Sequence, residues 1–321
     1  MADPAGAPGD RDHAERADAE RADAERADAE RADAERADAD RADAAERAAG
    51  RVRVPRVLCI AGTDPSGGAG LLADVKSVAA MGGYAMGVVT AVTVQNTLGV
   101  SGVHAVPVDT VVAQLDAVAD DVRIDAVKIG MLGEASLVEA VGDWLRRRRP
   151  PNVVLDPVMV ATTGGRLASD DASRMLRDLV PLVDLVTPNV PELGVLCGEP
   201  TAGRIETIVE QAELVHERTG CSVLATTGDL EDGSAEDILV RSEGGWRTTL
   251  RLPFVRVDTP HTHGTGCSLS SALATARVGS DDWEAAYRRV RPWMDGALRG
   301  GLTLEVGRGS GPLDHTWFLH H

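Results

Sequence analysis

Residues 54–80 read VPRVLCIAGTDPSGGAGLLADVKSVAA. The stretch begins with an apolar run, passes through a loop of small residues and glycines at 61–70, and continues into an apolar-rich segment at 71–80. The first run is typical of a buried parallel strand, since a strand covered on both faces needs no polar alternation, and the last segment is typical of a helix. A strand that enters a glycine loop and then a helix is the repeating unit of a doubly wound α/β sheet.

The same alternation continues along the chain. We expect further strands at 87–94, 126–129, 152–155, 185–186 and 221–225, and helices at 108–120, 136–149, 168–179 and 205–219. Segments 237–241 and 246–252 are predicted to form an antiparallel hairpin. The pattern predicts one α/β domain at 51–321, with a doubly wound, mostly parallel sheet and helices on both faces. Ligands bind such sheets at the carboxyl ends of the strands.

The first 50 residues differ in composition from the rest of the chain. From Glu15 to about Arg47 the sequence repeats Glu-Arg-Ala-Asp-Ala and contains nothing apolar larger than alanine. A five-residue period matches neither an amphipathic helix nor a heptad, so no apolar stripe forms. We predict that residues 1–50 are a disordered or solvated-helix low-complexity tail, with a partner-binding segment as the alternative.

Composition narrows the possible functions. The net charge of −17 argues against nucleic acid or an anionic membrane as a partner, because both require a basic face. The four cysteines are far apart and form no C-x-x-C pair, so neither a zinc site nor a disulfide framework is predicted. No apolar run of about 18 residues and no signal-peptide pattern occurs, and we expect a cytoplasmic protein.

The segment His263-Gly264-Thr265-Gly266-Cys267 precedes a run of small and apolar residues at 268–274. Two glycines around a small residue allow a sharp turn with exposed amides, and a loop that opens into a helix N-terminus favours an anion. A thiol at that helix end should have a lowered pKa and could act as a base or nucleophile. The alternative is a glycine turn that caps a core helix, with Cys267 as a buried structural thiol.

Small or polar residues follow six of the predicted strands. These loops lie at 62–64, 95–97, 130–132, 156–159, 187–189 and 226–229. The candidate ligands near them, Asp156, Asn189 and Glu192, offer oxygen atoms without imidazole or thiolate pairs, which suits Mg²⁺ better than zinc. An anion-binding loop beside Mg²⁺ carboxylates points to phosphoryl transfer. Taken without their context, Asn189 and Glu192 are better explained as helix-capping residues, since Asn189 precedes a predicted helix start.

From about Val54 to His315 the chain resembles the hydroxymethylpyrimidine kinases of thiamine biosynthesis, which belong to the ribokinase-like superfamily. The matching segments, in order, are 61–70, 94–97, 122–132, 156–159, 187–192, 262–267 and 304–309. The resemblance implies a ribokinase-like three-layer fold and a homodimer. It also implies an ATP- and Mg²⁺-dependent kinase that phosphorylates 4-amino-5-hydroxymethyl-2-methylpyrimidine and then its monophosphate, giving the pyrophosphate used in thiamine biosynthesis.

The resemblance also implies a role for individual residues. Gln95 would pair with the aminopyrimidine, since an amide can both donate to and accept from that edge. The residues that would line the pyrimidine are Gly62, Ala69, Asp74, Met131 and Val158. Those that would contact the nucleotide are Asp156, Asn189, Thr226, Thr227 and Gly228, with Glu192 and Asp156 on Mg²⁺. Gly264, Thr265 and Gly266 would form the anion hole, and Cys267 would accept the proton of the hydroxymethyl group.

The chain departs from the family pattern in its lysines. It has two lysines, Lys76 and Lys128. The family carries lysine at three loop positions where this sequence has Thr162, Thr226 and Pro260. A lysine beside nucleotide phosphates neutralises developing charge, so we expect altered nucleotide contacts. Asp229, if it lies near the phosphates, would need Mg²⁺ or Arg256 to offset its charge.

Two other functions stay open. A pyridoxal kinase of the same superfamily would also phosphorylate a ring-borne hydroxymethyl group, although Gln95 with Met131 favours a pyrimidine. The third interpretation is a catalytically weakened pyrimidine-binding or scaffolding protein, which the missing lysines favour. The presence of Asn189, Glu192 and Cys267 opposes it.

Overall fold

The computed structural model describes residues 53–159, 170–228, 230 and 235–320. The predicted tail at 1–50, Thr162 and Asp229 lie outside these ranges. The chain divides into two compact units, one of residues 1–53 with 143–149 and one of residues 54–142 with 150–321. The structure describes little of the first unit beyond the C-terminal part of helix α4 (Ala135–Arg148). The sheet and the pocket described below belong to the second unit.

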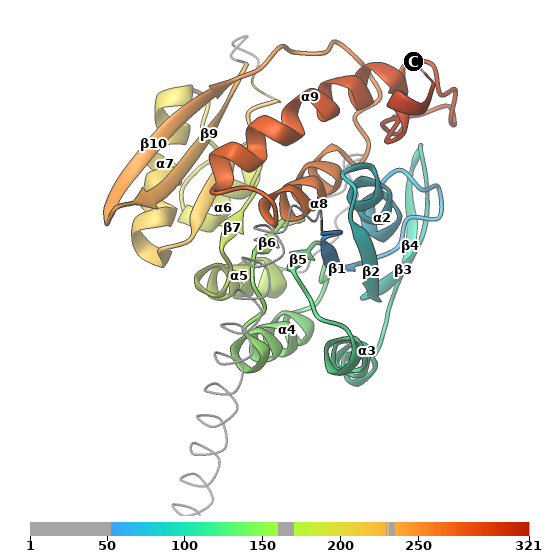
Figure 1. Ribbon diagram of the computed structural model, residues 1–321, viewed down its shortest axis with the longest axis horizontal. Coiled ribbons are helices and arrows are strands. Elements are labelled where there is room, and N and C mark those ends of the chain that lie inside the picture. The colour runs from blue at the N-terminus through green and yellow to red at the C-terminus, as the bar shows by residue number, and fades with distance from the viewer. Residues whose placement is uncertain (1–52, 160–169, 229, 231–234, 321) are drawn as a thin grey trace, which may run out of the picture. The chain divides into compact units, whose positions relative to one another are not determined.

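Eight strands form the main sheet, in the order β10-β9-β8-β7-β6-β5-β1-β2 (Figure 1). They are β1 (Arg56–Ala61), β2 (Tyr84–Val89), β5 (Ala126–Ile129), β6 (Val153–Leu155), β7 (Leu185–Val186), β8 (Ser222–Ala225), β9 (Glu236–Glu243) and β10 (Trp246–Pro253). Neighbours from β2 to β8 pair in parallel, and β9 and β10 add an antiparallel edge. The predicted mostly parallel sheet and the predicted hairpin are both confirmed.

Helices cover both faces of this sheet, and its strands are therefore buried on both sides. In β1, Val57 and Cys59 join the apolar cluster beneath helices α8 and α9, while Leu58 and Ile60 are buried on the opposite face. Helices α2 (Gly70–Ala80), α8 (Thr265–Arg277) and α9 (Trp283–Gly301) lie on the first side, and the second side carries α3 (Val108–Asp121), α5 (Asp170–Leu179), α6 (Val190–Cys197) and α7 (Ile205–Thr219) (Figure 1). None of the helices in the described ranges is long and apolar enough to cross a membrane.

The strand predicted at 87–94 is two strands, and this is a correction. The main-sheet strand β2 ends at Val89, and Thr90 anchors the break by donating from Oγ1 to the carbonyl of Met131 at 2.7 Å. The chain then forms β3 (Ala91–Asn96), which pairs antiparallel with β4 (Gly99–Ala105) in a separate two-stranded sheet. Gln95 therefore reaches the ligand-binding edge from this hairpin, and not from the end of a main-sheet strand as the sequence predicts.

Candidate active site

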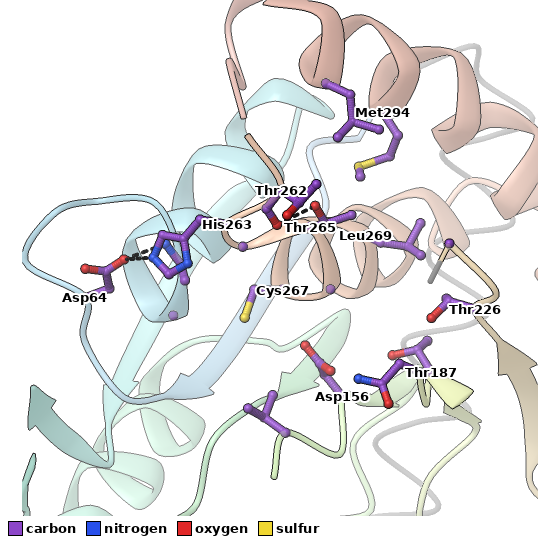
Figure 2. Close-up of a pocket in the computed structure, with 18 of the residues that line it drawn as sticks. Asp64, Asp156, Thr187, Thr226, Thr262, His263, Thr265, Cys267, Leu269 and Met294 are labelled. Atoms are coloured by element: carbon purple, nitrogen blue, oxygen red, sulfur yellow. Dashed lines mark hydrogen bonds and ion pairs between the residues drawn. The ribbon is translucent and has the colours of Figure 1, made fainter. Parts of the chain in front are cut away.

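A pocket of about 360 Å³ lies at the carboxyl ends of the parallel strands (Figure 2). Its walls come from the loops after the parallel strands of the main sheet, from β3, from the segment between β10 and α8, from the N-terminal turn of α8 and from α9. The predicted site residues that line it are Gly62, Ala69, Gln95, Met131, Asp156, Val158, Asn189, Glu192, Thr226, Gly228, Gly264, Thr265, Gly266 and Cys267. Loops spread over some 200 residues of sequence are thus brought to one cavity, as expected for the strand ends of a doubly wound sheet.

Two predicted site residues lie outside the pocket wall. Asp74 is fully buried beneath it and accepts hydrogen bonds from Lys128 Nζ and Ser271 Oγ, each at 2.8 Å. Thr227 is also fully buried, and its hydroxyl donates to the carbonyl of Glu236 at 2.7 Å. Asp74 therefore supports the site from below, and Thr227 fastens the loop after β8 to β9.

The first turn of α8 carries the anion-binding features. Gly264 precedes the helix with φ of 83°, and Thr265 closes the turn by donating from Oγ1 to the carbonyl of Thr262 at 2.7 Å. The amides that follow lie at a helix N-terminus, where backbone donors lack intrahelical partners and the helix dipole favours an anion. Gly264 is required for a second reason, since a Cβ there would overlap the carbonyl oxygen of Gly68.

We expect Gly264→Ala to destabilise the fold by about 2 kcal/mol more than Gly82→Ala, because the substitution adds overpacking to backbone strain. Gly82 is a matched control, since it has the same φ of 83° but an added Cβ would meet nothing within 4 Å. Urea unfolding of both variants measures the difference. Equal destabilisation would show that the contact with Gly68 relaxes without cost.

A buried charge cluster lies beneath the pocket. Lys128, on β5, is fully buried, with its Nζ 2.8 Å from Asp74 Oδ1 and 3.8 Å from Asp156 Oδ2. Burial opposes the charge of this ammonium, but the nearby carboxylates, with Asp74 foremost and Asp156 beside it, together outweigh burial and hold the pKa of Lys128 above its usual range. Burial raises the pKa of Asp156. The ammonium of Lys128 and a hydrogen bond from the hydroxyl of Ser270, at 3.3 Å, act in the opposite direction.

Cys267 lies next to this cluster, at the centre of the pocket. Figure 2 shows Cys267 and Asp156 between the pair of Asp64 and His263 on one side and Thr226 on the other. Burial raises the pKa of the Cys267 thiol to about 12, although the nearby Lys128 ammonium acts in the opposite direction. The lowered thiol pKa that the sequence predicts is therefore wrong for this structure, because desolvation outweighs the helix end.

Asp64 and His263 form a buried pair at the other end of the pocket, which motif reasoning did not single out. His263 Nε2 lies 2.7 Å from Asp64 Oδ2 and 3.3 Å from Gln95 Nε2. Asp64 also accepts hydrogen bonds from the amide and the hydroxyl of Ser66. Both members of the pair are almost fully buried. The pair fixes the loop after β1 to the start of the α8 motif and lies against the predicted pyrimidine-binding amide of Gln95.

The Asp64 carboxylate should make stability depend on pH. Burial disfavours its ionised form, but hydrogen bonds from His263 and Ser66 outweigh burial and lower its pKa from 3.8 to about 2. A folded-state pKa below the unfolded value stabilises the fold at pH 5 and above, by about 2 kcal/mol, and that contribution disappears as the pH falls towards 2. We expect Asp64→Asn to be less stable than the parent at pH 7 by at least this amount. Urea unfolding at several pH values should show the gap narrowing below pH 4, and a constant gap would contradict the assignment.

Asn189 and Glu192 form a capping box at the start of α6. Asn189 Oδ1 accepts from the amide of Glu192 at 2.9 Å, and Glu192 Oε2 accepts from the amide of Asn189 at 3.0 Å. The capping interpretation is therefore confirmed, and both residues also line the pocket. Within the described ranges, no group of three or more His, Cys, Asp or Glu could hold a metal ion. Mg²⁺ in nucleotide sites needs only one or two carboxylates, because phosphate oxygens complete its coordination.

One wall of the pocket is apolar and comes mostly from segments that the sequence left unassigned, α9 and the segment after β10. It includes Leu269 of α8, Met294 and Leu298 of α9, and Phe254 after β10. Helix α9 contains Pro292 and many arginines, so neither its length nor its apolar stripe is evident from the sequence. Figure 2 shows Leu269 and Met294 on the same side of the pocket as Thr226, away from Asp64 and His263, and this wall offers a surface for a flat ring.

Comparison with solved structures assigns the fold to a class. The ADP complex of Bacillus subtilis pyridoxal kinase matches with a TM-score of 0.74 at 29% identity, over 84% of this chain and 100% of that one. Phosphomethylpyrimidine kinase from Clostridium difficile 630 matches with a TM-score of 0.65 at 30% identity, over 77% of this chain and 100% of that one. The fold and the pocket define a small-molecule kinase of the ribokinase-like class.

Sequence comparison is more specific. The phosphomethylpyrimidine kinase family profile matches residues 64–314. The hydroxymethylpyrimidine/phosphomethylpyrimidine kinase of Salmonella typhimurium is 46% identical over 260 residues, which cover 80% of this chain and 96% of that protein. The thiamine biosynthesis multifunctional protein ThiED of Corynebacterium efficiens is 48% identical over 268 residues, 84% of this chain, and the chain spans 36% of that protein's length. The chain belongs to the phosphomethylpyrimidine kinase family, which confirms the resemblance and the prediction of a phosphotransferase.

Proposed function

We propose that the protein transfers the γ-phosphoryl group of ATP to 4-amino-5-hydroxymethyl-2-methylpyrimidine and then to its monophosphate, supplying thiamine biosynthesis. One observation carries the proposal. Cys267 and the first-turn amides of α8 lie in a single pocket, between the His263 end and the Thr226 end. Gln95 contacts His263 at the first end, and Asn189 pairs with Thr226 at the second. A phosphoryl group held at those amides would face an acceptor on one side and a nucleotide on the other.

The acceptor end suits an aminopyrimidine. The Gln95 amide can donate to and accept from a ring edge that offers both kinds of group. Gly62, Ala69 and Val158 leave room for a flat ring, and Met131 offers an adaptable apolar face. The second acceptor, the monophosphate, would place its phosphate against the same α8 amides.

The nucleotide end suits ATP with Mg²⁺. The side-chain ligand atoms at that end are oxygens, which Mg²⁺, a hard cation, prefers. We assign Mg²⁺ chiefly to Glu192, because the carboxylate of Asp156 already lies 3.8 Å from the ammonium of Lys128 and a second cation would be repelled. When bound, Mg²⁺ would neutralise charge on the nucleotide phosphates.

The proton of the substrate alcohol needs an acceptor. A thiol with a pKa of about 12 is protonated at neutral pH, so Cys267 needs a partner to act as a base. Asp156 is that partner, because its carboxylate lies beside the Cys267 thiol in the pocket and burial raises its pKa. As the alcohol oxygen forms its bond to the γ-phosphorus and the bond from that phosphorus to ADP breaks, the alcohol proton moves to Cys267 Sγ. The thiol proton moves to Asp156.

Pyridoxal is the second candidate acceptor. The pyridoxal kinase of Bacillus subtilis has a TM-score of 0.74 to this chain, and pyridoxal also carries a ring-borne hydroxymethyl group. ATP consumption measured with hydroxymethylpyrimidine, its monophosphate and pyridoxal separates the candidates. We expect activity with the first two and a much lower kcat/KM with pyridoxal. Tight pyrimidine binding without ATP consumption would instead establish the weakened binding protein.

We also propose a cytoplasmic homodimer. Support for a dimer comes from the β3–β4 sheet and its turn, which expose several apolar side chains: Val92, Val94, Leu98 and Val103. An isolated two-stranded sheet is marginal in water and gains stability from a partner surface. Analytical ultracentrifugation of the full chain tests the dimer, and the same measurement on a variant lacking residues 1–50 shows whether the tail takes part in assembly.

A further inference from the structure

The pocket is acidic for a site that receives a nucleotide. Five carboxyl residues line it: Asp64, Asp156, Glu192, Asp237 and Asp258. A polyphosphate entering such a cavity is repelled unless cations face it, and the amides of α8 supply only partial charges. Bound Mg²⁺ would offset part of the phosphate charge, and a cationic side chain is needed to offset the remainder.

Lys128 and Arg291 each already form an ion pair with a carboxylate. Lys128 is fully buried and bonded to Asp74. Arg291 lines the pocket, but its guanidinium pairs with Asp295 at 2.7 Å and stacks on Phe254, with 4.1 Å from Cζ to the ring centroid. Arg291 thus fastens α9 to the segment after β10, and its charge is already balanced.

Arg256 differs from both. It lies between β10 and α8, lines the pocket and is exposed. Its guanidinium donates from Nη1 to the carbonyl of Leu230 at 3.1 Å. A carbonyl leaves the charge unneutralised, and a guanidinium has five N–H donors in all. Across the described ranges, Arg256 forms no ion pair with a carboxylate.

The bond to Leu230 places Arg256 at the nucleotide end. Leu230 follows the loop after β8 that carries Thr226 and Gly228, and Thr226 forms a parallel bridge with Asn189. Arg256 therefore approaches the pocket beside Asn189, Thr226 and Gly228, three of the residues that we assign to the nucleotide. A planar guanidinium at that position can bind two phosphate oxygens at once.

We propose that Arg256 is the main side-chain cation on the phosphate chain of the nucleotide. The inference rests on the proposed kinase function. Arg256 would supply the positive charge that neither Lys76 nor Lys128 supplies in this pocket.

The test compares Arg256→Gln, Arg256→Lys and the matched control Arg251→Gln. Arg251 is half-exposed, lies on β10 and pairs with Glu236 away from the pocket. Loss of a charge-assisted contact should raise the Kd for MgATP, and its KM, by about 10- to 100-fold. The KM for hydroxymethylpyrimidine should change by less than about threefold. Arg256→Lys should recover part of the affinity, because it keeps the charge and loses the bidentate geometry.

Nucleotide binding is measured directly, by titrating a fluorescent ATP analogue with Mg²⁺ and no acceptor, over a range of salt concentrations. The parent should lose affinity more steeply with salt than Arg256→Gln, and thermal unfolding checks that each variant is folded. Parent-like binding by a folded Arg256→Gln would overturn the proposal. A parent that binds the analogue but phosphorylates no acceptor would contradict the kinase function, and the titration would still test Arg256.

Discussion

Replacing Cys267 with alanine should lower kcat/KM for the hydroxymethylpyrimidine alcohol by about 100-fold or more, the usual scale for loss of a positioned proton acceptor. The same variant should lose less than about tenfold on the monophosphate. That acceptor is already an anion, and its oxygen needs little help from a base. The thiol lies at the centre of the pocket beside Asp156, so the truncation removes the relay without disturbing either end. Steady-state kinetics with both acceptors measures the difference.

A matched control is Cys221→Ala, which removes a buried thiol that immediately precedes β8 and does not line the pocket. It should leave both activities close to those of the parent. Equal loss of the two activities in Cys267→Ala would contradict the assignment of Cys267 to proton transfer. The residue would then contribute only to the shape of the anion site.

Lys128→Met should destabilise the fold by about 3 to 5 kcal/mol, because it leaves the carboxylates of Asp74 and Asp156 buried without their cation. The substitution nearly preserves side-chain volume, so the loss would be electrostatic in origin. The free energy of unfolding in urea measures it. The double variant Asp74→Asn with Lys128→Met should recover part of the loss, since it removes one of the two unpaired charges.

Lys76→Met provides the comparison. Lys76 is exposed and its ammonium donates to the carbonyl of Gly67 at 2.7 Å. Its replacement should cost no more than about 1 kcal/mol. If the two lysine variants were destabilised to the same extent, Lys128 would not be the charge that holds the cluster together.

Most of the fold could be predicted because buried parallel strands and glycine loops leave local signals. The break at Thr90 could not be predicted, since residues 87–94 contain no proline, asparagine or internal glycine that would end a strand. The break depends on a hydrogen bond from Thr90 to Met131, 41 residues away. Helix α9 was not predicted for a different reason. Pro292 and the arginines of this helix interrupt its apolar pattern in the sequence, and its apolar face is evident only where the helix packs on the sheet.

The site was predictable in its residues and less so in its electrostatics. Loops at strand ends converge by topology alone, which is why Gly62, Asp156 and Asn189 share one pocket. The pKa of Cys267 could not be obtained from its place at a helix end, because burial raises that pKa to about 12 and burial depends on the whole fold. The pairing of Lys128 with Asp74 joins β5 to α2, which no local pattern indicates.

The most direct test of the proposed function is phosphorus NMR of the reaction of the full-length protein with hydroxymethylpyrimidine and excess MgATP. One pocket that serves both acceptors predicts a monophosphate signal that rises and then falls, as the paired signals of a pyrimidine pyrophosphate replace it. Accumulation of the monophosphate without any pyrophosphate, or phosphorylation of pyridoxal in preference to the pyrimidine, would contradict the account.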